Sequence, residues 1–139
     1  MVIKSFVTNR LVKGEDLNHH GTLFAGRCAQ WFVESGFIAA ANLTRPERVL
    51  CLNIHGMIFK KPVNKGNIIR FDSKVVYAGT TSLTSHVQVF FSHDDEFLLE
   101  GFITFIYVDE NAQPTPHGIV IEAEDPEDIA LQEKAKALH

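Results

Sequence analysis

The 139-residue sequence is poor in several kinds of residue, and each shortage excludes a class of protein. Two cysteines are too few for a disulfide-rich scaffold. Both stand in apolar runs, so we expect a buried, reduced pair, with one disulfide as the alternative. No apolar stretch approaches the roughly 18 residues of a membrane-spanning helix. The opening residues also lack the apolar core of a signal peptide, and we therefore expect a cytoplasmic protein.

Sequence patterns for metals, nucleic acids and nucleotides are also missing. There is no closely spaced set of His and Cys residues, no phosphate-loop glycine motif and no Gly-x-Ser-x-Gly segment. A formal net charge of −4 gives no reason to expect nucleic acid or an anionic membrane as a partner. The sequence thus requires no metal and no bound cofactor.

Apolar residues, in contrast, are plentiful. They make up 45% of the chain against 22% charged residues, which is typical of one soluble globular domain. Eleven phenylalanines beside one tryptophan and two tyrosines indicate an aromatic core.

Alternation of apolar and polar residues predicts five strands. A short first strand is expected over residues 2–8, and longer ones over 49–59, 67–78, 81–91 and 97–108, with turn-rich segments between the last four. Within 81–91, Leu83, Val87 and Val89 alternate with polar residues, which predicts an antiparallel sheet with one buried and one wetter face. The run 97–108 is apolar on both faces, so we expect it at the centre of the sheet or against a partner.

Residues 26–42 predict a long helix that the segment TRPER ends. The helix is apolar on two opposite sides, and only a narrow seam holds Arg27, Gln30 and Glu34. A helix of this kind is buried on both sides. One sheet can bury it in a single way, by curling around it, so the fold class is α+β with one central helix.

A second helix is expected near the C-terminus, over residues 124–138. Asp125 would be its N-cap and Pro126 its first residue, with lysines in the last turns. We therefore expect a single domain over residues 1–121 and an acidic helical extension over residues 122–139.

Glu34 is the one carboxylate in the central helix, and it has two interpretations. It either pairs with Gln30 or a neighbouring basic residue, or it faces a cleft and has a functional role. Arg27 is too far for a simple pair, because seven residues rise about 10.5 Å along a helix.

Several segments resemble one family in their order and spacing. NHHGTLFAG (18–26) precedes the helix, and GMIFKKPVNKGN (56–67) and AGTTS (78–82) follow it. They are similar to the hotdog-fold acyl-CoA thioesterases, in the branch with an Asn-x-x-Gly-x-Leu-Phe-Gly-Gly segment, a helix and a Pro-Val-x-x-Gly turn. The resemblance covers about residues 10–115. It implies a hotdog fold and hydrolysis of the thioester bond of acyl-CoA.

The resemblance also implies roles for residues at the start of the helix. Asn18 matches the asparagine that holds the substrate carbonyl or orients water. Backbone N–H groups around Ala25 and Gly26 would polarise the carbonyl, because a helix N-terminus favours developing negative charge and glycine permits close approach.

At one position the sequence departs from the family. The catalytic aspartate of this branch falls on Val33, which can neither accept a proton nor attack a thioester. Glu34 is adjacent but points about 100° away around the helix. A shift of the helix by one residue could restore Glu34, or His19, His20 or His55 could serve as the base. His19 and His20 could equally be solvent-facing turn residues, and His55 a hydrogen-bonded strand residue.

Coenzyme A carries three phosphate groups, and a basic cluster offers them partners. Five of the thirteen basic residues fall within residues 60–74, with Lys60 and Lys61 first. The solvated face of a strand would explain them equally well. By resemblance, the turn formed by Gly79, Thr80, Thr81 and Ser82 borders the nucleotide or pantetheine, although it could be only a hairpin turn.

The resemblance further implies a homodimer whose active sites use both chains, assembled further into a tetramer or hexamer. Because of Val33, a non-catalytic acyl-CoA-binding or regulatory protein is the alternative to an acyl-CoA thioesterase. A dehydratase acting on acyl thioesters is a third possibility, but the sequence lacks the His-rich, proline-spaced segment of such enzymes.

Overall fold

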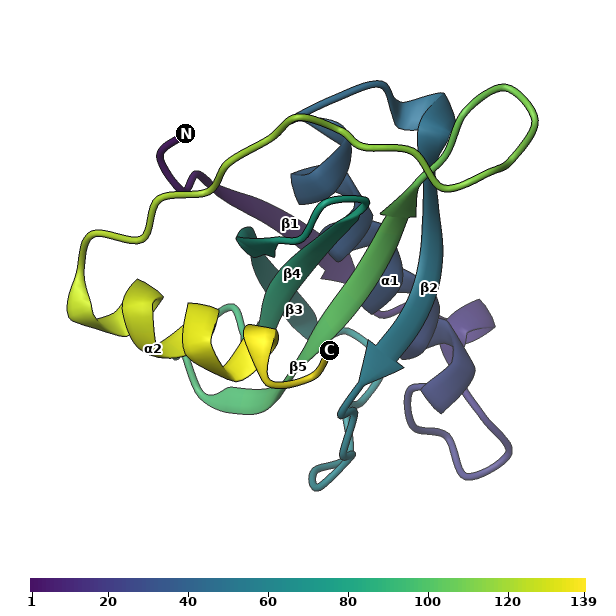
Figure 1. The fold of residues 1–139 in the computed structure, drawn as a ribbon. Coiled ribbons are helices and arrows are strands. Elements are labelled where there is room, and N and C mark those ends of the chain that lie inside the picture. Colours follow the sequence, from purple (N-terminus) through teal and green to yellow (C-terminus); the bar gives the residue numbers. More distant parts are fainter.

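The computed structural model describes residues 1–139 and contains one antiparallel sheet of five strands (Figure 1). The strands are β1 (Ser5–Leu11), β2 (Val49–His55), β3 (Ile68–Ala78), β4 (Ser82–Phe91) and β5 (Phe97–Tyr107). Their order is β1-β3-β4-β5-β2, so β1 and β2 form the two edges. The expected position of residues 97–108 inside the sheet is confirmed.

Three strand boundaries differ from the predicted ones by three residues or more, and one of them is the end of the first strand, at Leu11 instead of residue 8. The first strand begins at Ser5 instead of residue 2, because Val2 forms a bridge with Glu122 and leaves the sheet. The second ends at His55 instead of residue 59, because Gly56 has a φ of +76° and turns the chain away.

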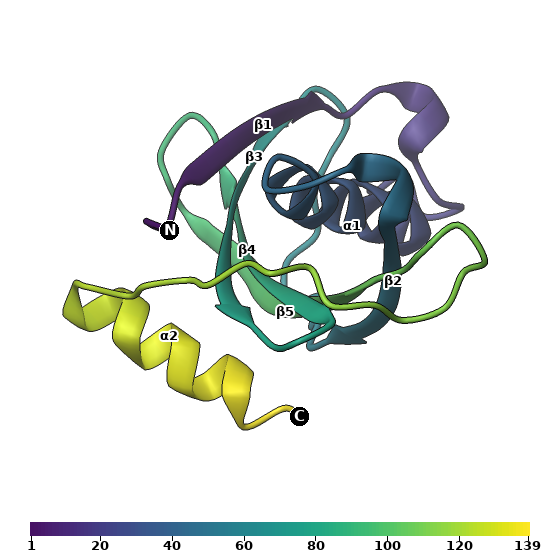
Figure 2. The same cartoon turned by 45° about the horizontal axis from the view of Figure 1, so that its top comes forward.

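The long helix α1 (Ala25–Ala41) lies across the concave face of the curled sheet, as Figure 2 shows. Its buried face includes Trp31 and Phe32. Trp31 packs edge-on against Phe71 of β3, with ring centroids 6.4 Å apart. Phe37 packs in the same way on Phe105 of β5, at 5.9 Å. The predicted wrapping of the sheet around one central helix is confirmed.

The middle of α1 approaches the sheet closely. The Ser73 hydroxyl donates to the carbonyl oxygen of Ser35, and the Ser85 hydroxyl donates to that of Gly36, both at 2.8 Å. A Cβ atom at Gly36 would come within 2.7 Å of Ile103 Cδ1. The mid-helix glycine therefore has a packing reason, which offsets its cost in helix propensity of roughly 1 kcal/mol.

The C-terminal helix α2 (Pro126–Lys136) packs on the outer face of the sheet (Figure 2). The Asp125 carboxylate accepts a hydrogen bond from the Asp128 N–H at 2.8 Å, which confirms the predicted N-cap. Leu131 and Ala135 pack against Val76 of β3. The prediction that this face is the wetter one is wrong where α2 and the chain end cover it, because three polar residues are buried there: Thr84, His86 and Thr104.

The two cysteines differ in environment. Cys28 is buried in α1, whereas Cys51 is exposed on the edge strand β2, and both are free thiols. The expectation of a buried pair is therefore wrong for Cys51, because an edge strand has no neighbour on one side. None of the helices is long and apolar enough to span a bilayer.

Candidate active site

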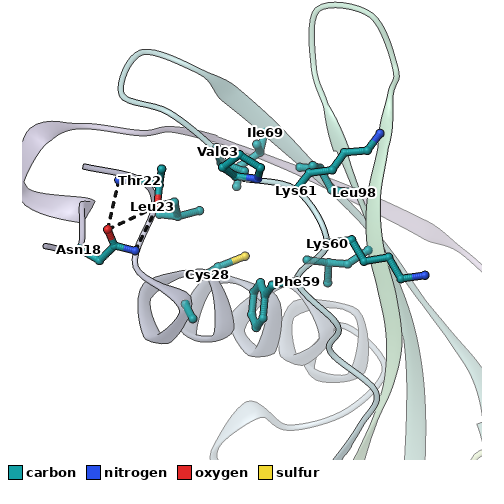
Figure 3. Close-up of a pocket in the computed structure, with 13 residues that line it drawn as sticks. Asn18, Thr22, Leu23, Cys28, Phe59, Lys60, Lys61, Val63, Ile69 and Leu98 are labelled. Atoms are coloured by element: carbon teal, nitrogen blue, oxygen red, sulfur yellow. Dashed lines mark hydrogen bonds between the residues drawn. The ribbon is translucent and has the colours of Figure 1, made fainter. Parts of the chain in front are cut away.

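A pocket of about 350 Å³ opens between the loop that precedes α1 and the segment that follows β2 (Figure 3). Its polar lining residues are Asn18, Thr22, Lys60 and Lys61. Five of its apolar lining residues are buried: Cys28, Val63, Ile69, Leu98 and Leu99. The pocket thus joins a polar, accessible rim to an apolar interior. This composition suits a ligand with a polar end and an apolar end.

Asn18 occupies the rim and closes a tight turn with its side chain. Its Oδ1 accepts from the N–H groups of His20 at 2.9 Å and Thr22 at 3.2 Å. Its Nδ2 donates to the Thr22 hydroxyl at 3.1 Å. A carboxamide has two N–H bonds, so this geometry fixes the side chain and leaves one N–H for a ligand.

The loop that carries Asn18 is anchored by Asp16, the last residue of the 3₁₀ helix η1 (Gly14–Asp16). Asp16 is 3% exposed, and its carboxylate accepts from the Lys13 N–H at 2.9 Å and lies 3.4 Å from Arg27 Nε. Its carbonyl oxygen accepts from the Phe24 N–H at 2.9 Å. Sequence reasoning missed this residue, because an Asp in a polar turn gives no sign of burial.

The start of α1 has no side-chain cap, since its N-cap residue is Phe24. The first backbone donors with partners are Arg27 and Cys28, which both bond to the Phe24 carbonyl, so the N–H groups of Ala25 and Gly26 have none. Ala25 lines the pocket. The arrangement can bind an oxygen that carries partial negative charge.

Gly26 allows the close approach of the Phe24 ring, whereas the sequence analysis expected the substrate carbonyl there. A Cβ atom there would lie 2.6 Å from the Phe24 ring, so the ring fills the space that the sequence analysis assigned to substrate.

The two predicted lysines lie in the same pocket as Asn18, although they are far from it in the sequence. Lys61 forms an ion pair with Glu96. Lys60 is exposed and forms no ion pair. Both extend their ammonium groups away from the apolar interior (Figure 3).

Glu34 lies outside this pocket and has protein partners. Arg10 of β1 donates to Glu34 Oε2 at 2.9 Å, and Gln30 donates to Oε1 at 3.3 Å. Within one chain, Glu34 thus pairs with neighbouring side chains and does not face the pocket. Val33 is half-buried and packs against the core, and no carboxylate lines the pocket.

The three candidate histidines also lie outside the pocket. His19 and His20 are exposed turn residues with ring centroids 4.0 Å apart. His55 Nε2 lies 3.1 Å from Thr104 Oγ1, so it is a hydrogen-bonded strand residue.

The turn formed by Gly79, Thr80, Thr81 and Ser82 is remote from Asn18. It joins β3 to β4, whereas the Asn18 loop follows Leu11, which pairs with Ile68 at the opposite end of β3. Gly79 and Thr80 line a separate pocket with His117 and Val120. One chain therefore brings together Asn18, Lys60 and Lys61, but neither Glu34 nor this turn.

Cys28 is the one thiol in the pocket, and burial raises its pKa to about 12. It is therefore a neutral thiol at pH 7 and has no nucleophilic thiolate. No group of three or more His, Cys, Asp or Glu side chains is placed to hold a metal ion.

Comparisons with known proteins give a consistent result. Residues 20–97 match the model of the thioesterase superfamily. The uncharacterised acyl-CoA thioester hydrolase YkhA of Bacillus subtilis is 31% identical over 124 residues, which span 86% of this chain and 71% of YkhA.

Two solved structures share the fold. The Staphylococcus aureus acyl-CoA hydrolase in complex with butyryl coenzyme A is 25% identical, with a TM-score of 0.79 over 96% of this chain and 80% of that one. A hexameric acyl-CoA thioesterase is 27% identical, with a TM-score of 0.80 over 96% of this chain and 86% of the other. The fold, the pocket and these matches show that this chain belongs to the thioesterase superfamily, as a hotdog-fold acyl-CoA thioester hydrolase.

Proposed function

We propose that the protein hydrolyses the thioester bond of acyl-CoA at the pocket beside Asn18. One observation carries the proposal: Ala25, whose N–H is unpaired at a helix start, a fixed carboxamide and two lysines border a single apolar pocket. The thioester would lie at the polar rim, the acyl chain inside and coenzyme A outside. The names of the relatives support the same substrate class.

The unpaired N–H groups of Ala25 and Gly26 would stabilise the charge that develops on the carbonyl oxygen as water attacks. Donors fixed in place before reaction need no reorganisation, and one such donor is typically worth about 3 kcal/mol of barrier. The remaining N–H of Asn18 would hold the same oxygen or the attacking water. The tetrahedral intermediate then expels the coenzyme A thiolate, and the carboxylic acid leaves.

Lys60 would attract the phosphates of coenzyme A, because it is exposed at the pocket rim and forms no ion pair, and Lys61 would do so in exchange for its ion pair with Glu96. The turn Gly79, Thr80, Thr81 and Ser82 stays a proposed coenzyme A contact, and one chain places it far from Asn18. It could reach the ligand only across a subunit interface.

No carboxylate or histidine side chain lines the pocket of a single chain, so the base comes from outside the pocket lining. Glu34 stands eight residues after Gly26, which places it roughly 12 Å along the helix axis from the free N–H groups. We propose that the partner's Glu34 acts as the base in a homodimer, where two-fold symmetry presents α1 of one copy to the Asn18 loop of the other. His20 is the second candidate, because it is exposed within two residues of Asn18.

A homodimer is supported by the edge strand β2, which exposes Leu50, Leu52 and Ile54. An exposed apolar edge strand is a ready site for pairing with another chain. The similar acyl-CoA thioesterase of known structure is hexameric, and we propose further assembly to a tetramer or hexamer here. We also propose that the protein is cytoplasmic and needs no cofactor beyond the coenzyme A of its substrate.

The decisive experiment measures release of free thiol from acyl-CoAs by the wild type, Glu34→Gln and Val33→Asp. We expect activity in the wild type and at least a hundredfold lower kcat in Glu34→Gln, because general-base catalysis contributes roughly 10²–10⁴-fold. Glu47→Gln is the matched control, since Glu47 is exposed and remote from the pocket. An unchanged kcat in Glu34→Gln would contradict Glu34 as the base and favour His20, and His20→Ala then tests that residue.

A non-catalytic acyl-CoA-binding protein is favoured by one observation, the absence of any carboxylate from the pocket. It predicts an inert wild type that still binds acyl-CoA, and a gain of hydrolysis in Val33→Asp. Calorimetry with coenzyme A and its thioesters separates this case from a protein that has no affinity for them.

A further inference from the structure

The apolar interior of the pocket would hold the acyl chain, so its size and lining bear on the length of the chain that fits. Buried apolar side chains enclose it from three sides: Cys28 from α1, Val63 from the segment after β2, and Leu98 and Leu99 from β5. In Figure 3 the sulfur of Cys28 points from the helix into the space between Phe59 and Val63. None of these groups carries a charge, and the Cys28 thiol offers only a weak hydrogen bond, so the interior suits an apolar ligand.

The Cys28 side chain lines the pocket as an apolar group and is not reactive. It is 3% exposed, its thiol forms no hydrogen bond, and its raised pKa keeps it neutral. A buried neutral thiol behaves as a small hydrophobic side chain.

The position of Cys28 relative to the proposed reaction centre is fixed by the helix. It follows Ala25 by three residues, so the two lie on the same face of α1 and about 4.5 Å apart along the axis. An acyl chain that leaves a carbonyl held at the Ala25 N–H and enters the interior therefore passes Cys28 first.

The size of the pocket limits the length of that chain. A dry cavity of about 150 Å³ lined by apolar side chains holds one benzene ring. The pocket of about 350 Å³ includes the polar rim that would hold the thioester, so its apolar part accommodates roughly six to ten carbons. We propose that the pocket selects acyl-CoAs with chains of about this length, and that the side chain at position 28 sets the limit. This inference rests on the proposed function and specifies its substrate.

The experiment measures kcat/KM for butyryl-, octanoyl-, dodecanoyl- and palmitoyl-CoA in the wild type and in Cys28→Met. We expect the wild type to prefer octanoyl-CoA. In Cys28→Met the longer side chain fills the passage, so octanoyl-CoA should lose at least tenfold in kcat/KM while butyryl-CoA loses no more than twofold. Ala41→Met is the matched control, because it makes the same side chain at the far end of α1, and its chain-length profile should equal that of the wild type.

Val63→Leu narrows the pocket from the opposite wall and gives a second reading if Cys28→Met does not fold. Like Cys28→Met, it should lower kcat/KM for octanoyl-CoA relative to butyryl-CoA. A profile that stays unchanged in both variants, or a wild type that prefers palmitoyl-CoA, would overturn the inference while leaving thioesterase activity in place.

Binding of a non-hydrolysable octyl thioether of coenzyme A, measured by calorimetry, separates this inference from the proposed function. If no thioester is hydrolysed, yet the thioether binds at least tenfold more tightly than coenzyme A and Cys28→Met removes that difference, the pocket assignment holds and the hydrolase proposal fails. Equal affinity for the thioether and coenzyme A would overturn the pocket assignment.

Discussion

Asp16 shows how one residue can position a site without facing it. Its carboxylate is nearly fully buried, accepts a hydrogen bond from the Lys13 N–H and forms an ion pair with Arg27, while its backbone carbonyl accepts from the Phe24 N–H. A buried charge is stable only when it is paired and hydrogen-bonded. Asp16 therefore couples the fold of the loop to the geometry at the start of α1.

Replacing Asp16 should cost both stability and activity. Asp16→Ala removes a charge-assisted hydrogen bond, and we expect the free energy of unfolding to fall by about 2 kcal/mol. The value stays moderate because the side chain of Arg27 is 37% exposed, so solvent screens its loss of a partner. Urea denaturation measures the change. Glu15→Ala is the control, since Glu15 pairs with Lys13 at the surface, and an equal loss there would contradict the role assigned to Asp16.

Among the secondary-structure elements, the packing of β5 against the segment that leaves β2 depends on Gly101. A Cβ atom at this position would lie 2.1 Å from the Gly56 carbonyl oxygen and 2.7 Å from that of His55. Both obstacles are backbone atoms, so no side chain can rotate to make room.

Gly101→Ala should therefore lower the free energy of unfolding by about 3 kcal/mol, at the upper end of the range for overpacked positions. The matched control is Gly14→Ala, because a Cβ atom at Gly14 meets nothing within 4 Å. Thermal melting of the two variants makes the comparison. A Gly101→Ala protein as stable as the control would show that the two strands can separate at this point without cost.

Helix α2 makes one face of the sheet sensitive to pH. It covers His86 of β4, whose Nε2 lies 2.8 Å from Glu100, and Lys74 pairs with Asp128 beside it. Burial lowers the pKa of His86 below its usual 6.5, and the contact with Glu100 reverses only part of that shift.

We propose that residues 122–139, which include α2, are an extension added to a domain formed by residues 1–121.

The free energy of unfolding should decrease as the pH falls below about 6.5. The unfolded chain binds a proton at His86 more readily than the folded state does, so acid favours the unfolded state. Denaturant midpoints between pH 7.5 and 5.5 should fall less in His86→Gln than in the wild type. His93→Gln is the control, because His93 is exposed, and a pH dependence shared by all three proteins would exclude His86 as its source.

For the whole molecule, the proposed catalytic arrangement requires two copies. The apolar edge strand β2 would lie at the two-fold axis, where each substitution occurs twice in close proximity. Leu52 is 60% exposed in the single chain, so a partner that pairs with β2 would cover it.

Leu52→Glu should convert the protein to monomers, because two like charges would meet in an apolar interface. Light scattering measures the change in mass, and kcat should fall at least tenfold with it if the base comes from the partner. Val7→Glu on the opposite edge strand is the control, since Val7 is also exposed. A Leu52→Glu protein that stays dimeric would remove β2 from the interface, and a fully active monomer would contradict a shared active site.

Much of the architecture could be predicted from the sequence. The helix buried on two sides and the five alternating strands are local periodic patterns, and the cap at Asp125 lies within one turn of the residues it serves. The boundaries at Ser5 and His55 could not be predicted, because contacts with the distant residue Glu122 and the turn at Gly56 set them.

The order and type of the elements and the two-sided helix follow from the sequence alone, since each is a property of neighbouring residues. That Val33 stands where relatives have an aspartate follows only from the resemblance to the family. Which candidate residues meet depends on the three-dimensional structure. It placed Lys60 and Lys61 beside Asn18, paired Glu34 with Arg10 and left Gly79 at the other end of β3. The physical reason is that strand register and the folding of loops between strands fix these long-range contacts, and a local pattern of residues does not contain them.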